Sequence, residues 1–158
     1  MNIEKLKIGV PLYLMMGPYN CDGCNAEIEV VALLAPNVLN FQDYVEGRVA
    51  IISDIVEIPP NILAEISSHN SYFRLRDARY SDSMVFANSC PHCDEMVDDF
   101  YIICEPDGPF MPMNKREARK LKLVELPIKE PFEIGAGLGR GSGEVILRFA
   151  RRLEPVSP

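Results

Sequence analysis

The sequence lacks the marks of several common classes of protein. No apolar run reaches the roughly 18 residues that a membrane-spanning helix needs, so no membrane span is predicted. No internal repeat or low-complexity segment is visible, and 47% hydrophobic and 25% charged residues are ordinary globular values. The opening MNIEKLKIGVPLYLMM has a proline-broken apolar run and no small-residue cleavage site, so no export signal is predicted. We therefore expect a cytoplasmic protein whose thiols stay reduced.

The sequence also lacks a catalytic or nucleotide-binding motif. The glycine-rich segment GAGLGRGSG (135–143) contains no G-x-G-x-x-G in any frame and no G-K-S/T. We interpret it as a flexible connector, with phosphate binding on its backbone N–H groups as the alternative. Neither a Ser-His-Asp arrangement nor paired carboxylates can be argued from spacing. The sequence therefore favours a protein that is not an enzyme, and an enzyme with an unrecognised site is the alternative.

Charge is distributed unevenly along the chain. Residues 1–111 contain 6 Lys and Arg against 17 Asp and Glu, a balance of −11, whereas residues 112–158 contain 10 against 6, a balance of +4. An acidic body repels phosphate backbones, so the net charge of −7 disfavours general nucleic-acid binding. The basic C-terminal segment 112–158 remains a candidate binding face, and its helix at 115–122 is either a solvated surface or a partner site. Its candidate interaction residues are Lys115, Arg116, Arg119 and Lys120.

Length and periodicity predict one α+β domain spanning residues 1–158. A chain of this size buries roughly 70% of its unfolded surface, so its core does not need disulfides. We expect mainly antiparallel β-hairpins and two or three short helices. The expected strands are residues 6–16, 26–35, 47–55, 72–80, 83–88, 99–105 and 123–126. The expected helices are residues 61–69, 115–122, capped by Asn114 with Glu117, and 143–154, capped by Ser142.

Two Cys-x-x-Cys pairs, NCDGCN (20–25) and NSCPHCD (88–94), carry the strongest signal. Zinc takes four thiolates in a tetrahedron at about 2.3 Å, and two such turns can supply them. The residue after each pair often needs a positive φ, which Asn25 and Asp94 tolerate. The insertion 25–89 separates the pairs, but the cost of loop closure rises only logarithmically with length. We therefore predict one metal site made by Cys21, Cys24, Cys90 and Cys93.

Other uses of these cysteines stay open. Two unrelated buried pairs or two local disulfides are one alternative. Cys-Pro-His-Cys is similar to the motif of thioredoxin-fold thiol oxidases, but the four acidic residues around it would raise the pKa of its thiols, which is the wrong direction for redox chemistry. Paired knuckles also look like those of rubredoxins, so iron is not excluded, although rubredoxins are much shorter. A filled four-cysteine site is structural because no position is open for water, and His92 would then point outward.

Two further expectations concern isolated residues. Arg74, Arg76 and Arg79 alternate with apolar residues on an expected strand, where they could neutralise nearby carboxylates. The fifth cysteine, Cys104, is interpreted as a buried small hydrophobic residue rather than a reactive thiol.

The segment VFANSCPHCDEMVDDFYIICEPDGPF resembles small uncharacterised bacterial proteins that contain a split zinc ribbon. Those proteins share an aromatic-x-Asn-x-Cys-x-x-Cys segment, then Asp-Phe and Glu-Pro-x-Gly-x-Phe, with an earlier Cys-x-x-Cys before an apolar strand. The matching residues are Asn88, Cys90, Cys93, Asp99, Phe100, Glu105, Pro106, Gly108 and Phe110, with Cys21 and Cys24 upstream. The resemblance covers about a third of the chain and departs at Asp94 and Asp98, where the family favours glycine. It implies a zinc-ribbon-like structure and no established activity.

These observations predict a zinc-binding protein with a structural four-cysteine site. The first functional hypothesis is a non-catalytic module that binds another protein through an edge strand or its basic C-terminal face. A nucleic-acid-associated zinc ribbon that uses the same face is the second. An enzyme with an unrecognised site, or a thiol-disulfide redox protein, is the third.

Overall fold

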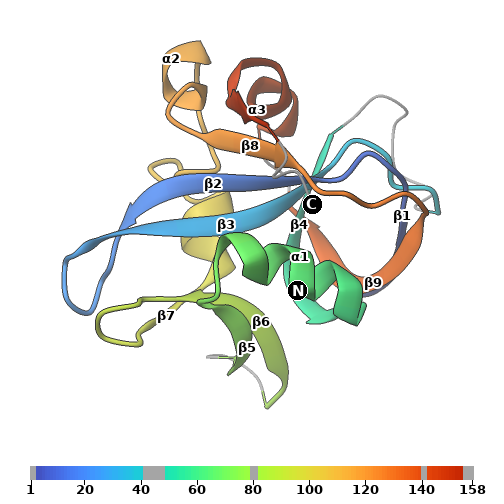
Figure 1. Ribbon diagram of the computed structural model, residues 1–158. Helices are drawn as coiled ribbons and strands as arrows, with labels where there is room; N and C mark the ends of the chain where they lie inside the picture. Colours follow the sequence, from blue (N-terminus) through green and yellow to red (C-terminus); the bar gives the residue numbers. More distant parts are fainter. Residues whose placement is uncertain (1–2, 41–48, 79–81, 140–141, 155–158) are drawn as a thin grey trace.

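The computed structural model describes residues 3–40, 49–78, 82–139 and 142–154 of the chain. Within these ranges short helices accompany a largely antiparallel set of strands (Figure 1). The strands are β1 (Glu4–Ile8), β2 (Tyr13–Asn20), β3 (Glu27–Ala35), β4 (Ala50–Glu57), β5 (Phe73–Asp77), β6 (Met84–Ser89), β7 (Met96–Val97), β8 (Lys122–Glu125), β9 (Phe132–Gly139) and β10 (Arg151–Leu153). The helices are α1 (Pro60–His69), the π-helix η1 (Phe100–Cys104), α2 (Lys115–Ala118) and α3 (Gly143–Phe149).

The main sheet has the strand order β1-β9-β4-β3-β2-β8-β10. Its described pairs are antiparallel except β8 with β10, which run parallel. The sheet curls, because the chain after β3 returns to β1: the N–H of Gly9 donates to the carbonyl of Asn37 at 2.8 Å, and the N–H of Leu39 donates to that of Lys7 at 2.8 Å. The curled half is visible around β1, β9 and β4 in Figure 1.

A smaller antiparallel sheet, formed by β5, β6 and β7, lies below the main one in Figure 1. Among the described residues, one β-bridge joins it to the main sheet, Ile55 of β4 with Phe86 of β6, and Phe73 of β5 packs into the core of that sheet. The buried side chain of Asn88 adds a second connection, since its Oδ1 accepts from the N–H of Val31 and its Nδ2 donates to the carbonyl of Val31, both at 2.9 Å. Asn88 therefore replaces a strand partner for β3 at the point where β6 comes between β3 and β4.

Apolar residues on both faces of the curled sheet form two cores. Strand β3 supplies both, because alternate residues of a strand point to opposite faces and the strand is almost wholly buried after Glu29. One core contains Leu33 and is covered by α1 through Ile62 and Ile66. The other core contains Leu34, and it packs against η1 and α3. Cys21 and Cys90 belong to this second core, so each pair of cysteines is anchored at one end in packed apolar structure.

Most of the expected elements are confirmed. The α+β class, the antiparallel strands and the short helices are as predicted, and the expected segments 26–35, 61–69 and 123–126 match β3, α1 and β8 to within a residue or so. The predicted capping box of α2 also forms in part: Asn114 Oδ1 accepts from the N–H of Glu117 at 2.9 Å, while Glu117 Oε2 accepts from the N–H of Met113 at 2.7 Å. No helix in the described ranges is long and apolar enough to cross a bilayer.

The prediction of a strand at 99–105 is wrong, because this segment forms the π-helix η1. The alternation of apolar residues suggested two faces, but the neighbours Ile102 and Ile103 are both buried, whereas Phe100 and Cys104 are exposed. The strand that follows the second cysteine pair is instead the two-residue β7. Cys104 is therefore not the buried small residue that we expected.

The glycine-rich segment 135–143 is not a flexible connector over its described part. Residues 135–139 complete β9, and 140–141 lie outside the described residues. The glycines permit close packing here: a Cβ on Gly139 would lie 2.8 Å from Cγ2 of Ile103 in η1. Tertiary contacts thus determine the conformation of this segment, although its composition is typical of loops.

Three predicted boundaries also change. The segment 6–16 contains parts of two strands, β1 and β2, because the chain turns at Gly9–Pro11 between them. The helix expected at 115–122 ends early and gives way to β8. The helix expected at 143–154 ends at Phe149, and residues 151–153 pair with β8 as β10; the side chain of Ser142 makes no cap. In the segments 115–122 and 143–154, strand pairing in the main sheet therefore outweighs the helical pattern of the sequence.

Candidate metal centre

Each Cys-x-x-Cys lies in a tight knuckle at the tip of a hairpin. In the first, between β2 and β3, the N–H of Asn25 donates to the carbonyl of Cys21 at 2.8 Å, and the N–H of Cys21 donates to that of Ala26 at 2.9 Å. The second knuckle, between β6 and β7, repeats this pattern: Asp94 donates to Cys90 at 3.0 Å, and Cys90 to Glu95 at 2.9 Å.

The two knuckles also share the predicted backbone conformation. Asn25 has φ 62° and Asp94 has φ 65°, so the expectation of a positive φ at both positions is confirmed. Backbone N–H groups point at the first sulfur of each pair, from Gly23 to Cys21 Sγ at 3.3 Å and from His92 to Cys90 Sγ at 3.4 Å. These donors stabilise negative charge on sulfur, so the knuckles are shaped for thiolates.

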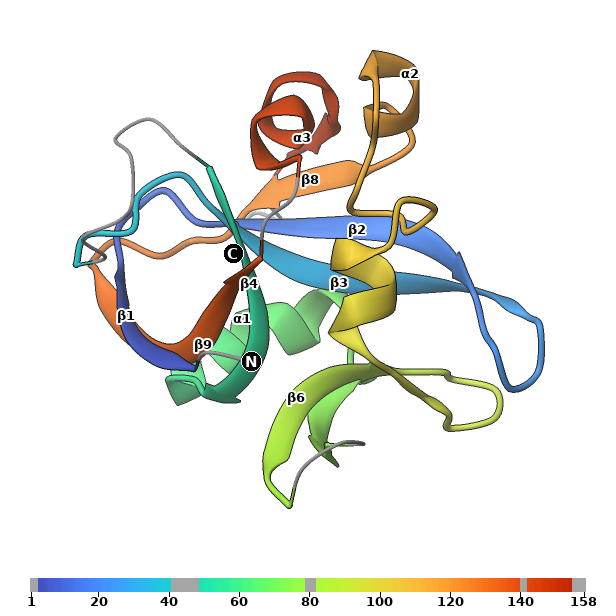
Figure 2. The same cartoon turned by 180° about the vertical axis from the view of Figure 1, so that it is seen from behind.

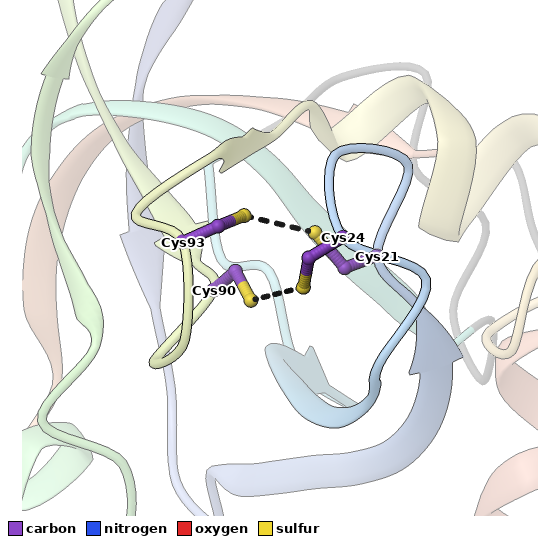
Figure 3. Close-up of side chains that lie close together, drawn as sticks. All are labelled: Cys21, Cys24, Cys90 and Cys93. Atoms are coloured by element: carbon purple, nitrogen blue, oxygen red, sulfur yellow. Dashed lines mark hydrogen bonds between the residues drawn. The ribbon is translucent and has the colours of Figure 1, made fainter.

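The knuckles face each other, and their sulfurs interdigitate (Figure 3). Cys21 Sγ lies 3.5 Å from Cys93 Sγ, and Cys24 Sγ lies 3.7 Å from Cys90 Sγ. All four sulfurs lie within 4.8 Å of one another. A tetrahedron with zinc–sulfur bonds of about 2.3 Å has edges of about 3.8 Å, so the arrangement fits a single ion at its centre.

Close approach of the two knuckles depends on one glycine. A Cβ on Gly23 would lie 3.1 Å from Cys93 Sγ, so a larger residue there would press on a sulfur of the opposite knuckle. His92 is exposed, as expected for a residue that points away from a complete set of four cysteines. All five cysteines are free thiols, so neither pair forms the local disulfide that was the alternative.

Crowding makes Cys24, Cys90 and Cys93 ionise unequally. Burial acts to raise the pKa of Cys90, but the N–H groups of Cys93 and His92 and the neighbouring thiols outweigh it and lower that pKa to about 6. A backbone hydrogen bond from Glu95 acts to lower the pKa of Cys93, yet Cys21, burial and the other two cysteines raise it to about 12. The pKa of Cys24 is raised as well, since burial and two neighbouring thiols outweigh its backbone hydrogen bond from Ala26. One thiolate forms easily, but the next thiols resist ionisation because each new thiolate adds a like charge to the cluster. A divalent cation removes this repulsion.

Two arginines of β5, Arg74 and Arg76, contact the second knuckle. Arg74 forms an ion pair with the Asp94 carboxylate. Arg76 Nη1 donates to the carbonyl of Asp94 at 3.0 Å and to Ser89 Oγ at 2.8 Å. The expectation that these arginines neutralise nearby carboxylates is thus confirmed for Arg74 and Arg76, and Arg79 lies outside the described residues. They also put positive charge beside a centre that four thiolates and one divalent ion would leave at −2.

The expectation that acidic neighbours raise the pKa of the second-pair thiols is wrong for Cys90, whose pKa is lowered to about 6. The local fold nevertheless does not favour thiol-disulfide chemistry at the second knuckle. A redox Cys-x-x-Cys needs its first cysteine at a helix N-terminus, where the pKa is lowered by the helix dipole. Here a turn and β7 follow Cys93, and the next helix, η1, begins only at Phe100. The partners of Cys90 and Cys93 are instead the two sulfurs of the first knuckle.

The basic residues expected to bind a partner lie elsewhere on the molecule. Lys115, Arg116, Arg119 and Lys120 are all exposed on α2 and the turn after it. Helices α2 and α3 lie side by side over β8 (Figures 1 and 2). Lys115 Nζ lies 5.3 Å from the centre of the Phe149 ring, and the guanidinium of Arg148 lies 5.1 Å from it, so one ring joins cations of both helices.

Sequence reasoning missed the contact between Asp54 of β4 and Asp99, the residue directly before η1. Asp99 Oδ2 accepts a hydrogen bond from the N–H of Asp54 at 2.8 Å, although 45 residues separate them. Asp54 has φ 52°, and Asp99 is buried. Burial raises the pKa of Asp99 to about 7, with added repulsion from Asp54 and Asp98, against the backbone hydrogen bond from Asp54. No local pattern signals such a pair, because β4 and η1 meet only in the folded chain.

Comparison with known proteins adds no further assignment: no protein-family model, no curated protein and no solved structure matches this chain. The geometry of the site therefore has to support any functional conclusion by itself.

Proposed function

We propose that this chain is a zinc protein with a split zinc ribbon, in which one structural ion bound by Cys21, Cys24, Cys90 and Cys93 fastens two hairpins together. The observation that carries the proposal is the interdigitation of four sulfurs within 4.8 Å, with cross-knuckle distances of 3.5 and 3.7 Å. Four thiolates complete a tetrahedron, so no position stays open for water or substrate. The ion would supply folding energy rather than chemistry.

Zinc is proposed rather than iron, although the same four ligands suit both. The knuckles are similar to those of rubredoxins, but the 65 residues between Cys24 and Cys90 exceed anything in that short fold. An iron form would absorb visible light through thiolate-to-iron charge transfer, whereas a zinc form is colourless.

Metal analysis of the purified native protein tests this assignment. We expect about one zinc per chain. Cys90→Ser should abolish stoichiometric binding, because three thiolates and a hydroxyl make a weaker site. Cys104→Ser is the matched control and should keep the full zinc content, since Cys104 lies on η1 outside the cluster. Native protein without stoichiometric metal, or equal losses in both variants, would refute the zinc site.

We further propose that the zinc-stabilised body is a non-catalytic module that binds an acidic surface of another protein through α2, α3 and β10. Three observations support this. The cations of this face come from the segment with a balance of +4, while the rest of the chain has a balance of −11. Arg151, Arg152 and Leu153 of β10 are exposed at the end of the main sheet. The guanidinium of Arg152 stacks over Tyr13 at 4.9 Å, which holds one cation of the face in place.

Capture of partners on immobilised protein, with nuclease-treated lysate of the native host, separates a protein partner from a nucleic acid. We expect captured protein to survive nuclease treatment and to be released by salt. Arg116→Glu with Arg119→Glu should abolish capture, whereas Lys5→Glu with Lys7→Glu, on β1, should not. Capture that disappears with nuclease would favour the nucleic-acid alternative. Capture that persists after charge reversal at Arg116 and Arg119 would refute the proposal that this face binds the partner.

A further inference from the structure

A cleft opens where β6 comes between β3 and β4. Strands β3 and β4 pair through Leu33 with Ile52, but three residues later Ile55 of β4 pairs with Phe86 of β6. The cleft has a volume of about 880 Å³ and lies between this fork and η1. Its size is within the range of pockets that hold small organic molecules. It is separate from the four cysteines, none of which lines it.

The backbone at the fork is shaped in an unusual way. Pairing of β4 with β9 shifts register between Ser53 and Glu57, where β4 has a bulge or similar irregularity, and Asp54 within this segment has φ 52°. Opposite it, η1 is a π-helix that begins directly after Asp99. Bulges, π-helices and strained residues recur beside binding sites, because each re-aims side chains at a cost in stability. These backbone features position Asp54 and Asp99, and the side chains that line the cleft indicate which ligand it would bind.

One carboxylate oxygen in the cleft lacks a partner. Asp99 is only 8% exposed, and its Oδ2 accepts from the N–H of Asp54 at 2.8 Å. Among the described residues no group donates to Oδ1, and the side chain of Asp99, the N-cap residue of η1, makes no capping hydrogen bond. No fully buried side-chain oxygen in this part of the chain is without a partner, so Oδ1 must reach accessible space, which at Asp99 is the cleft. A nearly buried carboxylate thus offers an open acceptor to whatever enters.

Charge and apolar surface in the cleft select the kind of ligand. Asp54 and Asp98 line it beside Asp99, and no described Lys or Arg side chain forms an ion pair with these three carboxylates. Val85, Ala87 and Met96, which form one apolar cluster, also line the cleft. Phe100 adds a ring that is 53% exposed. A negative end and an apolar wall complement a molecule with a cationic head and an apolar body.

We propose that this cleft binds a small primary amine carried on an apolar group, with the ammonium donating to Asp99 Oδ1 and to Asp54 and the apolar group lying on Val85, Ala87 and Phe100. The ammonium has three donors and no acceptor, which suits a site whose polar groups are carboxylate oxygens. This site does not depend on the zinc assignment, because it shares no residue with the cysteine cluster.

Isothermal titration of the metal-loaded full chain at pH 8, above the pKa of about 7 of Asp99, tests the proposal with 2-phenylethylamine and tryptamine as probes. The matched controls are 2-phenylethanol, which has the same ring without the charge, and phenylacetate, which reverses it. We expect the amines to bind roughly tenfold or more tightly than the alcohol, since a hydrogen bond to a charged group is lost, and phenylacetate not to bind. Failure of both amines to bind at millimolar concentration, or equal affinity for amine and alcohol, would overturn the proposal.

Variants locate the binding. Asp99→Asn keeps the shape of the side chain and an oxygen for the N–H of Asp54, so the fold should persist, but amine affinity should fall roughly tenfold or more. Asp98→Asn gives a second, less buried test of the same charge. Asp107→Asn is the control, since Asp107 is exposed on the turn after η1 and does not line the cleft. Amide chemical-shift changes on titration should centre on Asp54, Ala87 and Asp99; changes centred elsewhere, or unaltered affinity in Asp99→Asn, would refute the site.

Discussion

Asn88 shows at the scale of one residue how the two sheets are joined. Its side-chain amide completes both hydrogen bonds of Val31, in a place where β3 has lost its neighbouring strand. The site is buried, so water cannot replace the amide. A polar side chain here is therefore a structural requirement of the fork between β3 and β4.

Replacement of Asn88 by alanine should destabilise the protein by about 2 to 4 kcal/mol, because two buried backbone groups lose their partners. Asn70→Ala is a matched control. Asn70 is half-buried and also makes two hydrogen bonds to backbone, to Glu29 and Tyr72. These bonds are exposed, so water can replace them and the loss should stay below about 1 kcal/mol. Urea unfolding of the metal-loaded variants measures both values, and equal losses would contradict this role of Asn88.

The raised pKa of Asp99 gives a second residue-scale prediction. With a native pKa of about 7 and an unfolded value near 3.9, the folded protein holds a proton that the unfolded chain has already lost. The contribution of Asp99 to stability is therefore complete below the unfolded pKa, falls as pH rises between the two values, and is lost above about 7. We expect the difference in unfolding free energy between wild type and Asp99→Asn to follow that course.

Denaturant unfolding at a series of pH values measures this difference. Protonation of the cysteines at low pH affects both proteins alike, so it cancels in the comparison. The pKa of Asp54 is also raised, by burial and by Asp98, and it contributes a slope of the same sign in both proteins. A difference that does not vary with pH would show that Asp99 has an ordinary pKa.

At the scale of elements, the two short C-terminal helices begin in different ways. Asn114 caps α2 with a side-chain hydrogen bond to the N–H of Glu117, whereas Ser142 makes no such bond to α3. Asn114→Ala should therefore cost about 1 kcal/mol, and Ser142→Ala should change stability by less than about 0.5 kcal/mol. Thermal or urea unfolding of the two single variants tests the contrast, which equal effects would contradict.

Elements could be predicted from sequence where local chemistry decides them. The apolar run of β3, the proline at the start of α1 and the positive φ of Asn25 and Asp94 all follow from the residues themselves. The clustering of the four cysteines was predictable from local chemistry too, since two Cys-x-x-Cys turns together supply the four thiolates of one tetrahedral site.

Elements could not be predicted where contact with distant segments decides them. The alternating residues 99–105 form a helix because Ile102 and Ile103 must both enter the core against the sheet. The glycines of β9 form a strand because β1 and β4 lie on either side of it. The pairing of Asp54 with Asp99 depends on such contacts too, and no periodicity in the sequence indicates it.

At the scale of the whole molecule, the candidate metal centre lies where the smaller sheet meets the main sheet. Between described residues the two sheets share one bridge, Ile55 with Phe86, the hydrogen bonds of Asn88, and the packing of Phe73 and Val97 into the two cores. The proposed ion would add a connection of another kind, at the far end of β6, where both knuckles meet. Much of the structural zinc binding energy, about 10 kcal/mol or more in small zinc modules, would then act on this junction rather than on the curled sheet.

Chelation of the metal should therefore loosen the molecule unevenly. We expect faster amide hydrogen exchange at 21–26 and 90–97, and smaller changes in β1, β4 and β9, which keep their own apolar core. Exchange measured by mass spectrometry with and without chelator, with readdition of zinc as the control, tests this pattern. Uniform acceleration across the chain would show that the whole fold depends on the metal, and no change would show that the ion is not a connection at all.

The distance along the chain between the two knuckles has a consequence for biosynthesis. Cys24 precedes its partner Cys90 by 66 residues, and ribosomes add about 5 to 20 residues per second, so the first half of the cage waits roughly 3 to 13 s for the second. During that interval two cysteines stand alone on a nascent hairpin, open to oxidation or to capture of a wrong ion. If the four cysteines bind zinc as proposed, selection of the correct cation depends on the rate of translation as well as on affinity.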